Sequence, residues 1–197
     1  MFPQCVCKSC FVGLHDFRTI RRHLSEQVAI MVANALVSSR LDYCNSIFCS
    51  LTQKDCNRLQ CIQNSLARIV SNSTRFSHIS PVLKSLHWLP VRHRSIFKTL
   101  TIVYKCIHTG LPKYFVPFIS PYVCARNTRH SKPGNSFLQK PTYNSSVHKS
   151  KKHFDNSFAF DGPNLWNSLS ESIRTAPTLS SFRSSLKTYL FEQAFPL

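Results

Sequence analysis

The stretch PVRHRSIFKTLTIVYKCIHTG, from Pro90 to Gly110, is the clearest amphipathic helix in the chain. Proline suits the first turn of a helix because its missing N–H needs no partner there, and glycine commonly ends a helix. The apolar residues between them recur at helical spacing as one stripe: Ile96, Phe97, Leu100, Val103, Tyr104 and Ile107. A second face, about 80° wide, carries Arg94, Lys98, Thr101, Lys105 and His108. The stretch therefore predicts a helix that packs on one side and presents cations on another.

The positive charge of this helix continues well beyond it. From Cys56 to Phe154 the sequence holds sixteen Lys or Arg residues and no Asp or Glu, in a chain of 197 residues whose formal net charge is +17. A field of one sign and this size destabilises a compact chain unless a polyanion offsets it. RNA, DNA and an anionic membrane are therefore the candidate partners. At 43 % hydrophobic residues, the composition still supplies enough apolar material for one or two cores.

Helical signals also fill the sequence before this stretch. Apolar spacing predicts a short helix at Leu14–Leu24. A second helix, apolar almost all round, is expected to begin after an N-cap at Ser25 and to run to about Leu41. Thr52, with Asp55 three residues later, resembles a capping box that opens the next helix. The packed positions of that helix are predicted to be Leu59, Ile62, Leu66, Ile69 and Val70.

The pattern changes from Ser120 to Lys152, where Ser, Asn, Pro and Thr mix with basic residues. This composition cannot bury enough apolar surface to offset the entropy of ordering it, so a long basic loop is expected. Phe137–Tyr143 and Phe154–Phe160 are predicted to pair as one small β-hairpin. Helices are expected around Leu165–Leu169 and at Leu179–Gln193. The last helix places one apolar stripe on Leu179, Phe182, Leu186, Tyr189 and Leu190.

Together these signals predict a mainly α fold, an irregular helical bundle with a long basic loop and one small β-hairpin. Four segments are expected. Residues 1–13 form a poorly ordered N-terminal extension, and residues 14–119 form a helical domain. Residues 120–152 form the basic loop or linker, and residues 153–197 form a small C-terminal helical subdomain that packs on the first domain.

The sequence predicts an intracellular protein, cytoplasmic or nuclear, that is not secreted and has no membrane partner. The first ten residues contain no apolar core between a basic start and a small-residue cleavage site, so a secretory signal is not expected. The longest apolar run, Val28–Val37, is interrupted by Asn34. Ten residues are too few to cross a bilayer, which requires about 20 apolar residues in a helix. The nine cysteines are accordingly expected to be reduced.

Side chains capable of metal binding or catalysis lack the usual patterns. Cys5, Cys7 and Cys10, followed by His15, offer four zinc ligands, but their spacing matches no common knuckle and a second ligand pair is missing. Unstructured or partly buried thiols are the alternative. The eight Asp and Glu residues are never adjacent to one another. We therefore expect no catalytic residue, no bound metal, no cofactor and no small-molecule substrate.

The candidate site is instead a nucleic-acid-binding surface. Its predicted phosphate contacts are Arg92, Arg94, Lys98 and Lys105 on one helix, with Lys149, Lys151 and Lys152 in the loop. His87 and Trp88, together with Tyr104, are candidates for stacking on unpaired bases.

Plainer roles stay open for several of these residues. Trp88 lies between two leucines and fits a core position. Arg92 and Arg94 could cap helix ends or pair with the few acids, and a basic amphipathic helix could also lie on an anionic membrane. The loop argues against that last alternative, because its cations have polar neighbours and no exposed Trp, Phe or Leu.

Six blocks in this order carry a family resemblance: SRLDYCNS (39–46), LQCIQNSLAR (59–68), HISPVLKSLHWLPVRHR (78–94), YKCIHTGLPKY (104–114), LWNSLSESIR (165–174) and FRSSLKTYLF (182–191). Together they resemble the C-terminal, post-palm region of the polyprotein of LINE-type, jockey-like non-LTR retrotransposons. The resemblance covers roughly Phe11 to Phe195.

The resemblance implies that the parent polyprotein is an RNA-directed DNA polymerase. Such enzymes hold their metal ions on paired aspartates, which this chain lacks, and Asp42 has no neighbouring acid. The chain is therefore expected to be a non-catalytic remnant that binds RNA or DNA, with the parent's palm domain as a further partner. The alternative is an orphaned protein-interaction subdomain, with Val28–Val37 and Leu179–Gln193 exposed, or a decayed transposon fragment without independent function.

Overall fold

A computed structural model describes residues 2–43, 52–74, 76–122, 136–145, 150–151, 155 and 157–196. This part of the chain is mainly helical and contains no β-strand, so the predicted mainly α fold class is confirmed. The chain forms two compact units, residues 1–95 with 191–197, and residues 96–190. These divisions fall inside two helices, α6 (Val91–Thr109) and α10 (Leu179–Ala194), and differ from the predicted boundaries at 119/120 and 152/153.

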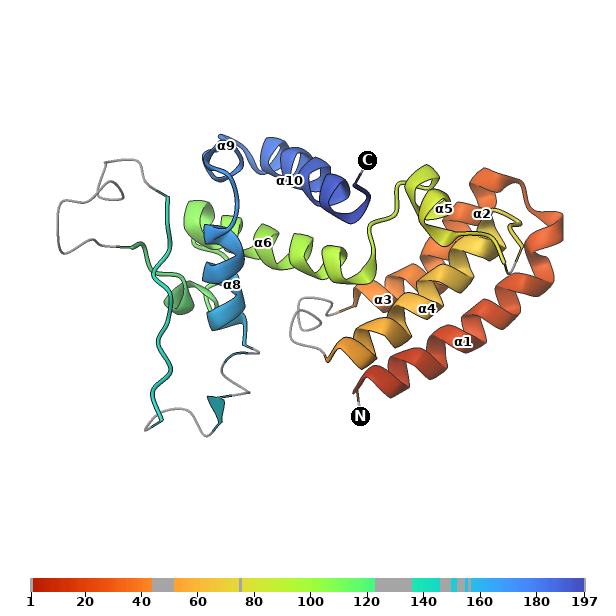
Figure 1. Ribbon diagram of the computed structural model, residues 1–197, viewed down its shortest axis with the longest axis horizontal. Helices are drawn as coiled ribbons and strands as arrows, with labels where there is room; N and C mark the ends of the chain where they lie inside the picture. Colours follow the sequence, from red (N-terminus) through yellow and green to blue (C-terminus); the bar gives the residue numbers. More distant parts are fainter. Residues whose placement is uncertain are drawn as a thin grey trace. The chain divides into compact units, whose positions relative to one another are not determined.

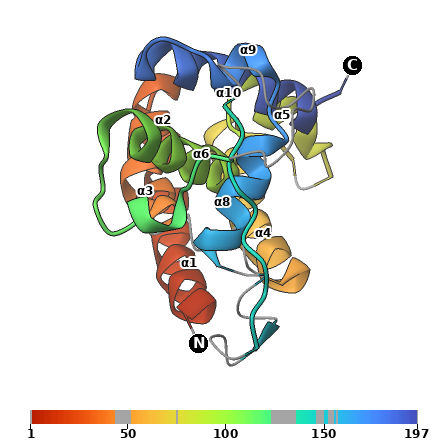
Figure 2. The same cartoon turned by 90° about the vertical axis from the view of Figure 1, so that its left-hand side faces the viewer.

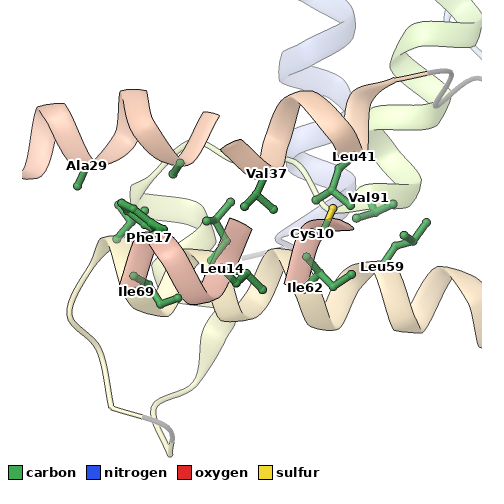
Figure 3. Close-up of a cluster of buried hydrophobic side chains, with 13 residues drawn as sticks. Cys10, Leu14, Phe17, Ala29, Val37, Leu41, Leu59, Ile62, Ile69 and Val91 are labelled. Carbon is green, nitrogen blue, oxygen red and sulfur yellow. The ribbon is translucent and has the colours of Figure 1, made fainter. Parts of the chain in front are cut away.

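The first unit is a small helical bundle. Its elements are α1 (Phe2–Ile20), the 3-10 turn η1 (Arg21–His23), α2 (Glu26–Ala33), the π-helical turn η2 (Asn34–Ser38), α3 (Ser39–Asp42), α4 (Gln53–Val70) and α5 (Ile79–Ser85). Helix α1 packs along α4 and also against η2 and α3, as Figures 1 and 2 show. The core lies where these helices meet. Figure 3 shows side chains of α1, α4 and the α2-to-α3 segment, including Phe17, Leu14, Val37 and Ile62, pointing toward one another.

Two helix starts in this unit are set by the predicted capping residues. The Ser25 side chain accepts a hydrogen bond from the backbone N–H of Val28. The Thr52 hydroxyl accepts from the backbone N–H of Asp55 and donates to the Asp55 carboxylate, at 3.3 and 2.8 Å. Both caps satisfy N–H groups that a helix leaves without an internal partner. The five predicted packed positions of α4 are all buried.

One expectation for this unit is wrong. Residues 1–13 were expected to be poorly ordered, but α1 begins at Phe2 and its Cys10 is fully buried in the core. Cys10 lies four residues before Leu14, so a buried cysteine extends the apolar stripe by one helical turn. The α2-to-α3 segment also contributes side chains to this core, while its Met31 is 62 % exposed.

The second unit is built around aromatic side chains of α6, α8 (Phe158–Asn167) and α10. It also contains the 3-10 turn η4 (Val116–Phe118) and the short helix α9 (Glu171–Arg174). The rings of Tyr104 and Phe182 stack with their centroids 4.4 Å apart, and Trp166 lies beside both. Helix α8 approaches α6 closely at Gly162, where a Cβ atom would come within 3.2 Å of Val103. The predicted end of α6 is confirmed, since Gly110 follows it with φ of 64°.

The predicted β-hairpin is wrong. Residues 158–160 belong to α8, and the segment 136–140 is extended but makes only an isolated bridge, between Pro121 and Leu138, within the described residues. Side chains of α8 take the place that a second strand would fill. The Asn167 amide accepts from Leu138 N–H at 2.9 Å and donates to the Leu138 carbonyl at 2.8 Å, and Trp166 Nε1 donates to the Ser136 carbonyl at 2.7 Å.

Candidate nucleic-acid interface

Within the second unit, helix α6 presents a narrow basic stripe. From Ile96 to Cys106 the exposed side chains are Lys98 and Lys105, and the remainder are buried or half-buried. The two lysines are seven positions apart in the sequence, which places them about 10.5 Å apart along the helix axis. Neither forms a hydrogen bond or ion pair with another residue that the structure describes. Two of the predicted phosphate contacts therefore lie together on one exposed face.

Other members of the predicted basic face of α6 have different surroundings. Thr101 is 8 % exposed, and its hydroxyl donates to the Phe97 carbonyl at 2.7 Å. The His108 ring stacks on Tyr104 with a centroid distance of 4.1 Å. The stacking predicted for Tyr104 on a nucleic-acid base does not fit its position, because Tyr104 is buried and its hydroxyl donates to the Ala176 carbonyl at 2.9 Å. The exposed stripe is thus narrower than the sequence pattern indicates.

Helix α10 adds two cations to this unit that the sequence prediction missed. Arg183 and Lys187 are exposed, and the Arg183 guanidinium lies 5.8 Å from the centroid of the Phe97 ring, over α6. Their spacing of four residues, beside the stripe formed by Phe182 and Leu186, was a signal in the sequence for a basic flank. We name Lys98, Lys105, Arg183 and Lys187 the basic face of the second unit.

In the first unit, the two arginines at the start of α6 differ. The Arg94 guanidinium donates to the Asp42 carboxylate, so one of the alternatives left open for Arg94, pairing with an acid, is the one observed. Arg92 is exposed. Asp42 is consequently a structural carboxylate that joins two sequence blocks 52 residues apart.

His87 and Trp88 form the end of α5. The backbone N–H of Trp88 bonds to the Leu83 carbonyl at 2.9 Å and that of His87 to the Lys84 carbonyl at 3.1 Å, the two bonds of a Schellman cap. His87 occupies the left-handed position of this cap with φ of 54°, where glycine is usual. Trp88 is half-buried and packs against the hydrophobic core, which is the plainer of the two roles considered for it. The exposed His87 ring lies 5.9 Å from the ring of Phe191.

The loop cations are only partly within the described part of the chain. Lys151 is exposed. Lys149 and Lys152 lie outside the described residues, and so does most of the predicted basic loop. Of the three predicted phosphate contacts in the loop, Lys151 is therefore the one that lies within the described residues.

Several cations outside the predicted site stabilise the fold. The clearest is Arg21, whose guanidinium donates to the carbonyls of Ile69 and Val70, the last residues of α4, at 2.6 to 3.1 Å. It also donates to the Leu24 carbonyl at 2.9 Å. These bonds satisfy carbonyls that the end of a helix leaves unpaired. The net charge of the chain thus overstates the charge available to a partner.

Two glutamine side chains of α4 hold the start of α6. Gln63 is fully buried, and its amide donates to the Leu89 carbonyl at 2.8 Å. Gln60 accepts from the backbone N–H of Val91 at 2.9 Å, which pairs one of the unsatisfied donors at the helix start. The sequence blocks at 59–68 and 78–94 therefore meet through side-chain-to-backbone bonds.

Burial shifts the pKa of several titratable groups in the first unit. Burial raises the pKa of the Cys10 thiol to about 11, so this thiol stays protonated at neutral pH. Burial and the neighbouring Arg92 lower the pKa of His93, whose buried Nδ1 has no hydrogen-bond partner within the described residues. Among those residues, no three or more His, Cys, Asp and Glu side chains are grouped closely enough to hold a metal ion. The side chain of Cys5 lies outside them.

Within the described helices, none combines the length and hydrophobicity required to cross a bilayer. Comparison with protein-family models, with curated proteins and with solved structures finds no match for this chain. The family resemblance therefore depends on the six sequence blocks, and the function must be argued from the surfaces and contacts described above.

Proposed function

We propose that this chain is a non-catalytic, nucleic-acid-binding piece of a LINE-type retrotransposon reverse transcriptase, corresponding to the region after the palm. It binds RNA or DNA through phosphate contacts, and the palm domain of the parent polyprotein is a second partner. The proposal places the chain inside the cell, in the cytoplasm or nucleus. The order of the six sequence blocks supports the family, and the basic face of the second unit supports the activity.

The basic face carries this proposal. Lys98 and Lys105 are the exposed residues along most of α6 in this unit, and Arg183 and Lys187 are exposed on α10. Cations that need not break an internal ion pair can neutralise phosphates and release counterions, which favours binding. Two of the chain's carboxylates are engaged elsewhere, with Asp42 on Arg94 and Asp55 in the cap of α4. These two carboxylates take part in different structural contacts and do not form a pair that could hold metal ions, which fits a chain without polymerase activity of its own.

The test compares two double variants that remove the same charge. Lys98→Ala with Lys105→Ala removes two contacts of the basic face, while Lys54→Ala with Lys84→Ala removes two exposed lysines of the first unit. Each phosphate contact to a single strand contributes about 0.7 to the slope of log K against log salt. That corresponds to about fourfold in affinity at 0.15 M salt, so the first variant should bind single-stranded RNA about 15-fold more weakly.

The control variant should stay within about twofold of the natural chain. Equal losses in the two double variants would contradict the basic face, because they would show that net charge alone governs binding. Fluorescence anisotropy with a labelled oligonucleotide at fixed salt measures the RNA affinity of both double variants. Circular dichroism of all variants checks that exposed-lysine substitutions leave the helices intact.

One observation favours a second function, a protein-interaction module. Phe11 and Val12 on α1 are 58 % and 61 % exposed, and Met31 on α2 is 62 % exposed. The tail helix fits this alternative less well than expected, because Phe182 and Leu186 of α10 are fully buried. Under this alternative, Phe11→Ser with Val12→Ser should convert a self-associating or palm-bound chain into a monomer in light-scattering chromatography. An unchanged particle mass in the variant would contradict the role of Phe11 and Val12 in a protein interface. A decayed fragment without function would show neither interaction.

A further inference from the structure

A cavity in the second unit opens beside the extended segment 136–140. Its volume is about 490 Å³, and the described residues that line it are Tyr122, Phe137, Leu138, Gln139, Lys140 and Asn167. Pockets that hold small organic groups usually measure about 300 to 1,000 Å³. The cavity is therefore large enough for a flat aromatic ring, and the described residues that line it all belong to one compact unit.

The walls of the cavity are fixed by backbone contacts. The backbone N–H of Tyr122 bonds to the Phe137 carbonyl at 3.0 Å, and that of Gln139 bonds to the Ser120 carbonyl at 2.8 Å. On the other edge of the segment, the Asn167 amide bonds to the backbone N–H and the backbone carbonyl of Leu138. Tyr122 remains 48 % exposed on this framework. The backbone that carries this exposed aromatic side chain is thus already positioned by hydrogen bonds.

Two cations, Lys140 and Arg174, lie close to the aromatic residues that line the cavity. Lys140 lines the cavity and is exposed. The Arg174 guanidinium lies 3.9 Å from the centroid of the Phe137 ring and is 6 % exposed. Its Nε and Nη1 are buried and have no hydrogen-bond partner within the described residues. Burial lowers the pKa of Arg174, and the neighbouring Glu171 opposes that shift. A buried cation with unsatisfied donors favours an anionic group nearby, because the burial of charge is otherwise costly.

We propose that this cavity receives one unpaired base of single-stranded RNA, with the base against the Tyr122 ring and the adjoining phosphate at Lys140. The inference rests on the proposed nucleic-acid binding and names which part of the ligand enters the second unit. The cavity should tolerate all four bases. The Asn167 amide is already bonded to Leu138, and an aromatic face stacks with any base.

The test uses a tyrosine exchange with a matched control. Tyr122→Ala should weaken binding of a labelled 12-nucleotide RNA about tenfold to a hundredfold, the usual effect of removing one stacking ring. Tyr122→Phe keeps the ring and should bind within twofold of the natural chain. Tyr114→Ala, which removes another exposed tyrosine of the same unit, should also stay within twofold. Lys140→Ala should reduce the salt slope by about 0.7, while Tyr122→Ala leaves the slope unchanged.

A change in the RNA tests the same contact between a base and Tyr122. An RNA with an abasic backbone should bind the natural chain as weakly as Tyr122→Ala binds the intact RNA. Equal binding of intact and abasic RNA, or equal effects of Tyr122→Ala and Tyr114→Ala, overturns the base pocket while salt-dependent binding by the basic face stands. An absence of salt-dependent RNA binding by the natural chain overturns both proposals.

Discussion

The contact between Asn167 and the segment 136–140 gives the sharpest prediction about stability. Asn167→Ala removes the donor and the acceptor that pair the backbone of Leu138, at 2.8 and 2.9 Å. Leu138 is 4 % exposed, so little of that backbone is open to water. The substitution therefore leaves one N–H and one carbonyl without their partner in a largely buried place.

The size of the effect follows from those two groups. A buried backbone group left unpaired costs about 1–3 kcal/mol. Asn167 itself is only half-buried, and water can replace part of its amide, so the expected loss in the free energy of unfolding is about 2–3 kcal/mol. For a unit of roughly 100 residues this lowers the midpoint of thermal unfolding by about 8–24 °C.

Trp166 offers a local probe for this measurement. The chain has two tryptophans, and a Trp88→Phe background leaves Trp166, beside Asn167, as the only fluorescent indole. Denaturant unfolding followed by Trp166 emission should show the loss for Asn167→Ala. Ser168→Ala, an exposed neighbour whose hydroxyl makes one local bond to Leu165, should change stability by less than about 0.5 kcal/mol. Equal stability of the two variants would refute the role of Asn167 as a substitute for a strand.

Two further predictions concern the first unit. His87 has a positive φ, a conformation that a residue with a Cβ atom adopts at a cost. Both His87→Gly and His87→Ala lose the ring, but only alanine keeps a Cβ, so His87→Gly should be more stable by about 1 kcal/mol in urea unfolding. Equal stability of the two variants would contradict the left-handed cap. The lowered pKa of His93 means that the unfolded chain takes up a proton more readily, so stability should fall as the pH drops below 6.5. His93→Gln should flatten that acid limb, measured by urea unfolding between pH 5 and 7, and an unchanged pH profile would show that His93 is not responsible.

Local signals predicted much of the helical structure. Ser25 and the Thr52–Asp55 pair were identified as caps because their side chains bond to backbone groups only three residues away. The limits of α6 followed from Pro90 and Gly110 for the same reason, since proline and glycine act on their own backbone. The start of α1 was missed because cysteine was not counted as an apolar position, although Cys10 is fully buried.

Contacts between residues far apart in the sequence could not be predicted from the spacing of apolar and polar residues. Asn167 and Leu138 are 29 residues apart, and Arg94 and Asp42 are 52 apart, so neither pairing has a spacing that can be recognised in the sequence. The hairpin prediction failed for this reason, because an extended segment can be completed by side chains of a helix as well as by a strand. Among the predicted site residues, Lys98 and Lys105 lie on one exposed face, whereas Arg94 is engaged by an acid.

Salt titration of RNA binding tests the central claim most directly. The basic face offers four exposed cations, and each phosphate contact to a single strand contributes about 0.7 to the slope. The logarithm of the association constant should therefore fall against the logarithm of salt concentration with a slope of about −2.8 or steeper. A slope near zero between 50 and about 200 mM salt would contradict phosphate binding by this surface.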